Sequence, residues 1–412
     1  MPHQMTGDQS LLKRINRMAL VRLVKAEPGL SRVDLANRTG LTKTTVGMLV
    51  QELIDEGWLH QSAPAEVQGV GRRPLPLTLD GDSIGLIGAE IGVDYLNVVS
   101  CNLKGEVLHA RCVPNRHKDV GRTLRALAAM VGRAHSELTA PGRRVLGLGL
   151  GVPGTIDVKD AVLRFAPNLG WHGVKIEQLL SARLAEAGCG GLPVIAMNEA
   201  KAAALSEYVF GAEPHAGPLV YLAIGVGLGA GIVLSERLYV GHDGIAGEVG
   251  HTIIDRGGPR CACGRRGCAE TFVSQRAVSR ELTGKDEPVL SIAELQARLA
   301  AGDRAALKAA RKAGEYLGVL LQNLANAYNP AVMVLGGPLV QLGEPFVDAA
   351  RRSMEANGGR YDFHRHSVRV CRFGIDACAI GAAGAVFQRF LHSVEAHPAP
   401  PRRRARLAAA AG

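Results

Sequence analysis

Long apolar stretches are absent from this sequence. None of its segments reaches the roughly 18 consecutive apolar residues that a helix needs to cross a bilayer. The N-terminal stretch M-P-H-Q-M-T-G-D-Q-S also lacks the apolar centre of a secretory signal peptide. The sequence therefore excludes a membrane-spanning protein, argues against secretion and predicts a cytoplasmic protein without a membrane partner.

A large basic excess is also lacking where it would matter most for DNA binding. The formal net charge is +10, but four arginines after Glu395 contribute +4 in a tail that holds no acidic residue. Residues 1–80 carry ten Lys and Arg against eight Asp and Glu, a net charge of only +2. A role in DNA binding must therefore be argued from residue pattern rather than from total charge.

The composition is that of a folded protein with more than one domain. A hydrophobic content of 47% with 51 glycines is typical of a globular α/β chain. A length of 412 residues is too great for one ordinary core and predicts two or three domains of roughly 100–200 residues each.

Residues 1–80 show the periodicity of three short helices. The first, over residues 11–25, is predicted to bury Leu11, Leu12, Ile15, Met18, Ala19 and Leu23. Ser31 and Thr42 are predicted N-caps of the second and third helices. The third helix is predicted to bury Val46, Leu49, Val50, Leu53 and Ile54, which recur at intervals of three and four residues.

The other face of the third helix carries small and hydrogen-bonding side chains, which suit base edges and phosphates. Two short strands, 57–60 and 75–79, flank the loop G-V-G-R-R-P, whose arginines could enter a minor groove. This order of elements predicts a winged helix-turn-helix domain; a three-helix interaction module without a DNA role is the alternative. The residues predicted to contact DNA are Ser31, Arg32, Thr42, Lys43, Thr44, Thr45, Met48, Gln51, Arg72 and Arg73.

From residue 84 onward the pattern changes to strands. Segments 84–91, 95–102 and 106–113 predict a meander, which is followed by a helix over 121–139 and a strand over 145–151. Segments 219–225 and 229–234 begin a second meander, so the chain repeats a strand-rich unit. Further helices are predicted over 292–301, 304–327 and 380–391, with a strand over 332–335.

Three of the eight cysteines lie within eight residues of one another. Together with a histidine ten positions upstream, they offer a complete tetrahedral set for Zn²⁺, with no position left for a reacting water. The candidate ligands are His251, Cys261, Cys263 and Cys268. The spacing C-x-C-x4-C is looser than that of common zinc fingers, so three buried thiols beside a surface histidine are the alternative.

The same stretch, G-E-V-G-H followed by C-x-C-G-x-x-G-C-x-E, resembles the signature of the ROK family, which groups bacterial sugar repressors with sugar kinases. The resemblance implies a structural zinc on the histidine and the three cysteines. It also implies a two-lobed, actin-like (ribonuclease-H-like) fold with a cleft between the lobes. The residues that it implies at the sugar are Asn168, Asn198, Glu199, Glu248, His251 and Glu270. Residues 1–80 resemble the winged helix-turn-helix arm of ROK repressors, which the family's kinases lack.

Three positions depart from the pattern that ROK kinases use for phosphate. A D-x-G-G-T-like loop is replaced by E-I-G-V-D over residues 90–94, which puts the negative charge of Asp94 where ATP would approach. A G-T-G-x-G-type turn becomes G-V-G-L-G over residues 225–229, without the threonine hydroxyl. The catalytic aspartate becomes Glu199, whose extra methylene moves a base by about 1 Å.

We therefore predict a sugar-responsive DNA-binding transcriptional regulator that represses carbohydrate genes and is not an enzyme. Residues 1–80 would bind operator DNA, residues 84–392 would sense a small sugar or sugar phosphate, and residues 393–412 would form a disordered basic tail. A homodimer or homotetramer would recognise an inverted repeat. The alternatives are an ATP-dependent sugar kinase with a DNA-binding arm and a scaffold protein that has lost its ligand.

Overall fold

The computed structural model describes residues 9–62, 75–157, 160–211, 217–284, 287–358 and 367–392. Arg72, Arg73 and the tail 393–412 lie outside the described residues, so the predictions made for them stay predictions. In the described part of the chain, none of the helices combines the length and the apolar character that a bilayer crossing requires.

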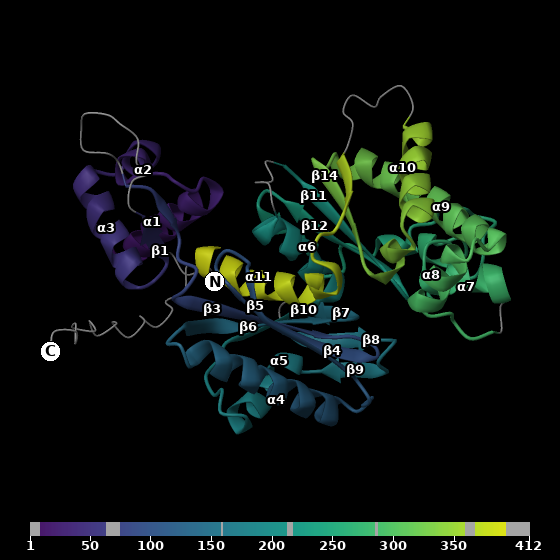
Figure 1. Ribbon diagram of the computed structural model, residues 1–412, viewed down its shortest axis with the longest axis horizontal. Helices are drawn as coiled ribbons and strands as arrows, with labels where there is room; N and C mark the ends of the chain where they lie inside the picture. Colours follow the sequence, from purple (N-terminus) through teal and green to yellow (C-terminus); the bar gives the residue numbers. More distant parts are fainter. Residues whose placement is uncertain are drawn as a thin grey trace.

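The N-terminal unit, here called the head, contains three helices and a two-stranded antiparallel sheet (Figure 1). Its elements are α1 (Gln9–Ala26), α2 (Arg32–Thr39), α3 (Lys43–Asp55), β1 (Leu59–Gln61) and β2 (Leu77–Leu79). Both predicted caps are confirmed, because Ser31 accepts a hydrogen bond from the amide of Asp34 and Thr42 accepts one from the amide of Thr45. These caps satisfy amides that the first turn of a helix leaves without intrahelical partners.

The predicted buried faces of the head helices are right for α3 and partly wrong for α1. Four of the five apolar positions predicted for α3 are buried, and Ile54 is half-buried. In α1 the buried residues are Met18, Leu20, Val21 and Val24. Leu12 and Ile15 are instead 53% and 42% exposed. Since the buried positions all lie in the second half of α1, its first turns extend beyond the core of the head.

Residues 84–392 form two lobes, each built on a five-stranded sheet with the same topology. The strand orders are β10-β6-β3-β4-β5 and β15-β14-β11-β12-β13. In each sheet the first strand, β3 or β11, pairs antiparallel with the next strand, β4 or β12. On its other side the first strand pairs parallel with β6 or β14, which in turn pairs parallel with β10 or β15. The repeated strand-rich unit predicted from the sequence is thus confirmed as two lobes with one topology.

The strands of the first lobe are β3 (Ile84–Ile91), β4 (Tyr95–Asn102), β5 (Val107–Pro114), β6 (Arg144–Val152) and β10 (Val194–Asn198). Those of the second lobe are β11 (Leu219–Ile224), β12 (Leu228–Leu234), β13 (Arg237–Leu238), β14 (Val332–Gly336) and β15 (Ser367–Val370). A small third sheet, β7 (Thr155–Asp157), β8 (Val162–Ala166) and β9 (Trp171–Val174), extends the first lobe and was not predicted.

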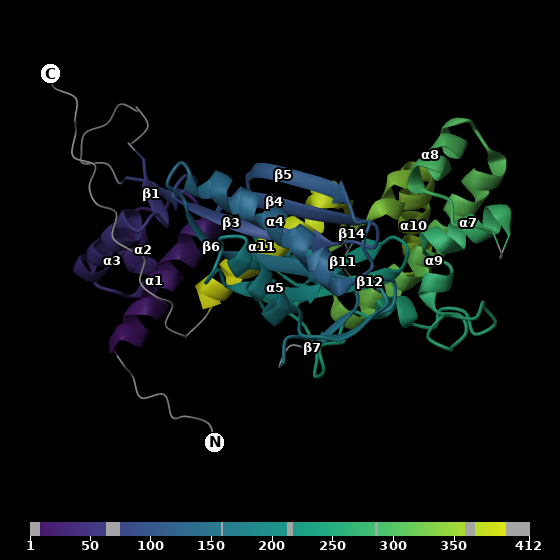
Figure 2. The ribbon, with the colours of Figure 1, turned by 90° about the horizontal axis from the view of Figure 1, so that it is seen from below.

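The helices of the lobes are α4 (Val120–Thr139), α5 (Ile176–Glu186), α6 (Glu199–Phe210), α7 (Gln275–Thr283), α8 (Ile292–Ala300), α9 (Arg304–Tyr328), α10 (Glu344–Asn357) and α11 (Ala377–His392). Helices α6 and α11 lie between the two sheets (Figure 1). The strand alternation shows this layering: Leu86 of β3 packs in the core on the α11 side, whereas its neighbour Ile87 packs with α4. The head and the helices α7–α10 lie at opposite ends of the molecule in both views (Figures 1 and 2).

Helix α11 touches both β3 and α6 with its backbone rather than through intervening side chains. A Cβ atom added to Gly88 of β3 would lie 1.7 Å from the carbonyl oxygen of Ala379. One added to Gly381 of α11 would lie 1.8 Å from the carbonyl oxygen of Ala202 in α6. Glycine is the residue that allows such close approach of two backbones, so α6, α11 and the first sheet form one tightly packed block.

The head is fixed to this block through the last turns of α11. Trp58 stacks on Phe387, with ring centroids 6.4 Å apart, and contacts Phe390 at 6.1 Å. Arg22 of α1 donates a hydrogen bond of 2.6 Å to the carbonyl of Leu391. A single hydrophobic core therefore runs from the head helices into α6 and α11.

The contact at Gly88 predicts a specific loss of stability. Gly88→Ala forces a methyl group onto the α11 backbone and should lower the free energy of unfolding by about 1–3 kcal/mol or more. Gly47→Ala, in an open position of α3, is the matched control and should raise it by about 0.5–1 kcal/mol. Urea unfolding of both variants measures the difference. Equal midpoints would contradict the packing described here.

Candidate metal centre and ligand site

The histidine and the three cysteines predicted to bind metal come together in one place. The four potential ligand atoms of His251, Cys261, Cys263 and Cys268 all lie within 4.8 Å of one another. His251 Nδ1 is 3.6 Å from Cys261 Sγ, and Cys263 Sγ is 3.6 Å from Cys268 Sγ. A tetrahedral zinc with its usual bond lengths gives edges of about 3.6 Å between N and S and about 3.8 Å between two S atoms. The donor set and its spacing therefore fit a closed tetrahedral metal site.

Backbone hydrogen bonds hold this loop in a compact shape. The amide of Cys261 donates to the carbonyl of Arg265 at 2.7 Å, and the amide of Ile254 donates to that of Gly267 at 2.9 Å. Gly267 has a φ of +73° and leaves no room for a Cβ, which would lie 1.6 Å from the carbonyl oxygen of Asp255. The glycines of the motif thus permit the tight fold that brings the thiols together.

The three thiols differ in their readiness to ionise. Hydrogen bonds from Arg265 lower the pKa of Cys263 to about 6. Burial raises the pKa of Cys268 to about 12 and also raises that of Cys261. A bound cation would offset the cost of ionising the two buried thiols, since metal ligation requires thiolates.

On the first lobe, two of the predicted ligand-binding residues, Asn198 and Glu199, lie at the start of α6. The side chain of Asn198 caps α6 by accepting from the amides of Ala200 and Lys201. Its amide nitrogen also donates to the carbonyl of Gly154 at 3.0 Å. Asn168 is exposed, in the turn after β8. The structure brings Asn198 against Gly154 through this bond, and the contact of each asparagine with a sugar stays a prediction.

On the second lobe, the predicted ligand-binding residues lie on the two short 3₁₀ helices that flank the metal loop, η1 (Val249–His251) and η2 (Ala269–Thr271). Glu248 precedes η1 and is exposed. Glu270 accepts a hydrogen bond of 3.1 Å from the amide of Leu228. His251 turns Nδ1 towards the thiols, so its Nε2 is the ring nitrogen that a sugar hydroxyl could use.

Electrostatic coupling joins residues of the two lobes. Burial and then the charge of Glu248 raise the pKa of Glu199 to about 7. Burial raises the pKa of Glu90 to about 8, and the charge of Glu199 adds to that rise. Near neutral pH a large share of these two carboxyls is therefore protonated and can donate a hydrogen bond.

Tyr95 was missed by sequence reasoning. Its side chain packs over the loop 90–94, the first of the three positions that depart from the kinase pattern. Its hydroxyl donates a hydrogen bond of 2.6 Å to Glu90, and a Cβ added to Gly92 would lie 2.4 Å from its ring. The side chain thus covers the segment that corresponds to the phosphate loop. The cross-strand position of Tyr95 relative to Glu90 depends on the register of β3 and β4, which no local motif marks.

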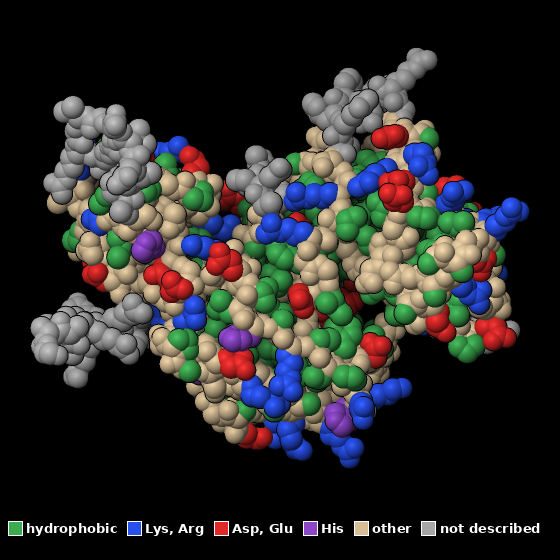
Figure 3. Space-filling model, in the orientation of Figure 1, with side chains coloured by type: hydrophobic (Ala, Val, Ile, Leu, Met, Phe, Trp, Pro, Cys, Tyr) green, Lys and Arg blue, Asp and Glu red, His purple; other side chains and the backbone are tan. Residues whose placement is uncertain are grey.

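Most of the predicted DNA-contacting residues that the structure describes lie on or beside α3. Lys43, Thr44, Met48 and Gln51 are exposed along α3, as is the cap Thr42, and Thr45 is half-buried. Arg32 donates to the carbonyl of Gly47 and to the side chains of Gln51 and Gln61, at 3.2, 3.0 and 3.1 Å. Ser31 is 4% exposed and engaged in its cap, so its role at DNA stays a prediction. On the side of the molecule drawn in Figure 3, lysines and arginines are spread over the head and both lobes rather than gathered in one patch.

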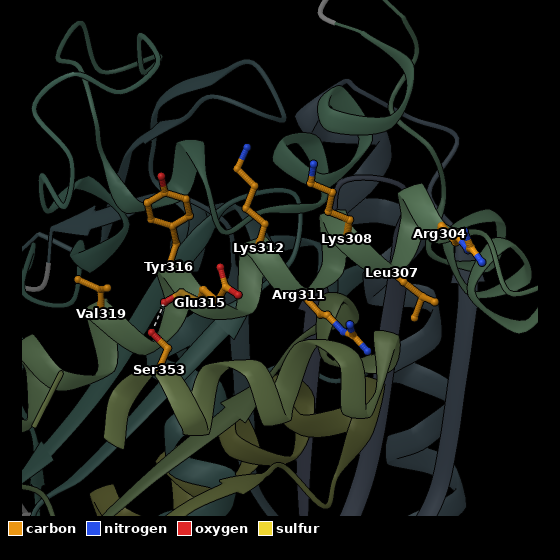
Figure 4. A pocket seen from close by; sticks show the side chains of 9 residues that line it. All are labelled: Arg304, Leu307, Lys308, Arg311, Lys312, Glu315, Tyr316, Val319 and Ser353. Carbon is orange, nitrogen blue, oxygen red and sulfur yellow. Dashed lines mark hydrogen bonds between the residues drawn. The ribbon is translucent and has the colours of Figure 1, made fainter. Parts of the chain in front are cut away.

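A large surface hollow lies apart from these residues. It has a volume of about 700 Å³ and follows the outer face of α9, where Arg304, Lys308, Arg311 and Lys312 line it (Figure 4). None of its lining residues belongs to the metal centre or the predicted ligand site. The hollow therefore does not bear on the chemistry of either.

Comparison with known proteins agrees with this arrangement. The sequence model of the ROK family matches residues 86–389, and that of the IclR helix-turn-helix domain matches residues 18–63. The chain belongs to the ROK family. The xylose repressor of Caldicellulosiruptor bescii is 30% identical over 93% of this chain and 98% of its own length.

Two further relatives show how far the likeness extends. A crystal structure of a ROK family transcriptional regulator, a homologue of E. coli Mlc, superimposes with a TM-score of 0.76 and 26% identity over 93% of this chain and all of its own. The glucokinase of Halalkalibacterium halodurans is 29% identical over 74% of this chain and 95% of its own length. The likeness to repressors thus spans both head and lobes, whereas this glucokinase matches three quarters of the chain.

The metal centre predicts one bound metal ion per chain. Cys263→Ser should lose that ion and unfold at a lower temperature, because metal binding and loop folding are linked. Cys112→Ser, at an exposed cysteine on β5, should retain both properties. Elemental analysis of freshly purified protein measures the content. Less than about a tenth of an equivalent of metal in the unmodified chain would rule the site out.

Proposed function

We propose that this ROK protein is a sugar-responsive transcriptional repressor, with the head at residues 1–80 and the sensing domain at residues 84–392. The observation that carries the proposal is the union, in one chain, of a helix-turn-helix head and the ligand-binding pattern of the family. The relative from C. bescii, named a xylose repressor, aligns with 93% of this chain, from head to lobes, and with 98% of its own length. An inverted repeat bound by a homodimer or homotetramer is the arrangement expected of paired heads.

The metal in this proposal is zinc, and its role is structural. Three thiolates and one imidazole fill the tetrahedral preference of Zn²⁺ and leave no place for a reacting water. The ion would fix the loop between Glu248 and Glu270, so these two carboxylates would be held at a set distance from each other. Zinc thus supports effector binding without contacting the effector.

The charge of the ligand site favours an unphosphorylated sugar. Glu199, Glu248 and Glu270 are carboxyl groups, and Lys201 is the neighbouring cation. A phosphate placed among these acids would meet repulsion in a partly desolvated site. Neutral hydroxyls can instead donate to carboxylates and accept from the protonated fraction of Glu199.

Helices α6 and α11 offer the route from ligand to DNA. α6 begins with Glu199 at the ligand site, and α11 ends under Trp58 of the head. Because their backbones touch at Gly381, a change in lobe closure that moves one helix moves the other. The sugar would act by population shift, favouring one closure and with it one spacing of paired heads.

The experiment that tests the proposal is DNA selection in the presence and absence of sugar. Genomic fragments that bind the full-length chain are selected with and without xylose, glucose and N-acetylglucosamine. Thr44→Ala and Gln51→Ala should each cost about 1–3 kcal/mol of affinity for the selected operator, because each removes a polar group from the exposed face of α3. Glu355→Ala on α10 is the control and should leave affinity unchanged.

Two outcomes would contradict the proposal. One is operator binding by the Thr44 and Gln51 variants that equals binding by the unmodified chain. The other is an affinity for DNA that none of the three sugars changes. A chain that binds DNA but no sugar would retain only the DNA-binding half of the proposal.

A sugar kinase is the second candidate, favoured by the 29% identity to a glucokinase over the lobes. Three features of this chain argue against phosphoryl transfer, which depends on positioning and electrostatic stabilisation of phosphate. Asp94 and Val93 replace the loop residues, Tyr95 covers Gly92, and Glu199 stands at the position of the base. We infer that the chain binds sugar without ATP turnover.

This inference predicts a null result in a kinase assay. Sugar-dependent release of ADP by the unmodified chain should not exceed the background of a Glu199→Ala control. Glu199→Asp should not restore activity on its own, since the phosphate-side residues remain changed. Turnover above the Glu199→Ala background, measured by coupled oxidation of NADH, would overturn the repressor-only interpretation.

A further inference from the structure

Lys201 is a buried lysine that neither the metal centre nor the predicted ligand contacts explain. It lies in the first turns of α6 and is 7% exposed. Its neighbours Ala200, Ala202, Ala203 and Ala204 are buried as well. Burying an ammonium group among apolar residues costs free energy unless the group is hydrogen-bonded or paired with an opposite charge. A buried lysine in this alanine-rich stretch is therefore expected to have such a partner.

Among the described residues, Lys201 has one hydrogen-bond partner and lies within electrostatic reach of one carboxylate. Lys201 Nζ donates a hydrogen bond to the carbonyl of Gly244. Burial lowers the pKa of Lys201, and the charge of Glu248 opposes that shift. Both Gly244 and Glu248 lie on the loop between β13 and η1, residues 239–248. An ammonium group has three donors, so the Gly244 carbonyl leaves two of them for other acceptors.

Backbone hydrogen bonds fix the base of this loop, since the amide of Tyr239 donates to the carbonyl of Ile232 at 2.7 Å and that of Ala246 donates to the carbonyl of Val240 at 3.1 Å. Gly241, Gly244 and Gly247 have φ values of +75°, +75° and +96°, so its turns are built on glycines. Gly247 is held against β12, where its carbonyl accepts from the amide of Ala230 at 2.8 Å. The bond from Lys201 ties the preceding part of the loop to α6. Glu248 therefore follows a segment whose two ends are held on β12 and whose middle is tied to α6 by Lys201.

We propose that Lys201 is a positioning residue of the ligand site: its buried ammonium anchors the loop 239–248 to α6 and holds the Glu248 carboxylate in place for a sugar hydroxyl. The inference rests on the proposed function, because it assigns Lys201 a role in binding the same neutral sugar. It also makes Lys201 the link between the helix that carries Asn198 and Glu199 and the loop that carries Glu248.

A double-mutant cycle tests the role. The full-length chain is titrated calorimetrically with xylose, glucose and N-acetylglucosamine, and the sugar that the unmodified chain binds is used throughout. Lys201→Met keeps the length of the side chain and should weaken binding about 10- to 100-fold, the worth of a hydrogen bond to a charged group. Glu248→Gln should weaken it as well. The double variant should be at most about threefold weaker than Glu248→Gln alone, because Lys201 acts through Glu248.

Two controls separate this role from a general effect on folding. Lys175→Met, at an exposed lysine of the first lobe, should bind sugar as the unmodified chain does. Lys201→Met should keep its metal content and its affinity for operator DNA in the absence of sugar. If Lys201→Met does not fold, Lys201→Leu replaces it, since Leu also removes both the charge and the donor to the Gly244 carbonyl.

The outcomes distinguish the inference from the function on which it rests. Unchanged sugar affinity in the folded Lys201 variants overturns the inference and leaves the proposed function standing. Independent effects that multiply in the double variant also overturn it, because Lys201 would then not act through Glu248. If the unmodified chain binds none of the three sugars, the proposed function fails and the inference fails with it.

Discussion

The backbone contact between α6 and α11 is the constraint on which the rest of this structure depends. At Gly381 the two helices approach so closely that a Cβ would lie 1.8 Å from the carbonyl of Ala202. Both helices are held between two sheets, so neither can shift alone without opening the core. The ligand-site residues at the start of α6 and the aromatic contact of Trp58 at the end of α11 are therefore parts of one rigid block.

The metal loop, residues 251–268, needs another source of stability, since it carries little apolar surface. Its glycines allow tight turns but give no side chains to pack, and burial is the largest cause of the raised pKa values of Cys261 and Cys268. A cation on the four ligands would supply the missing cohesion. Lys201 does for the loop 239–248 what the metal would do for residues 251–268: each ties a glycine-rich segment to a fixed point. Glu248 thus lies between the loop 239–248 and the metal loop, and Glu270 directly follows the metal loop.

Local signals allowed much of the head to be predicted, because Ser31 and Thr42 are caps whose partners lie three residues away. The four candidate metal ligands were also predicted from the sequence, and the structure brings them together, since they lie within 18 residues and belong to a long motif. The buried face of α1 was partly wrong because α1 packs on α11, about 370 residues further along the chain. Lys201 was missed because its partner Gly244 lies 43 residues away on a loop. Tyr95 was missed although Glu90 is only five residues away, because no local motif marks the turn that brings them together.

The two segments that correspond to the phosphate side of a kinase site, 90–94 and 225–229, already make contacts within this chain. In the turn 225–229, the amide of Leu228 already donates to the carboxylate of Glu270. In the loop 90–94, the ring of Tyr95 covers Gly92, and the Tyr95 hydroxyl donates a hydrogen bond to Glu90. Phosphates brought to the loop 90–94 would meet the negative charge of Asp94. A sugar hydroxyl meets no such cost, because it can donate to one carboxyl and accept from another. These interactions support the proposed function, in which the site would hold a sugar and leave it unchanged.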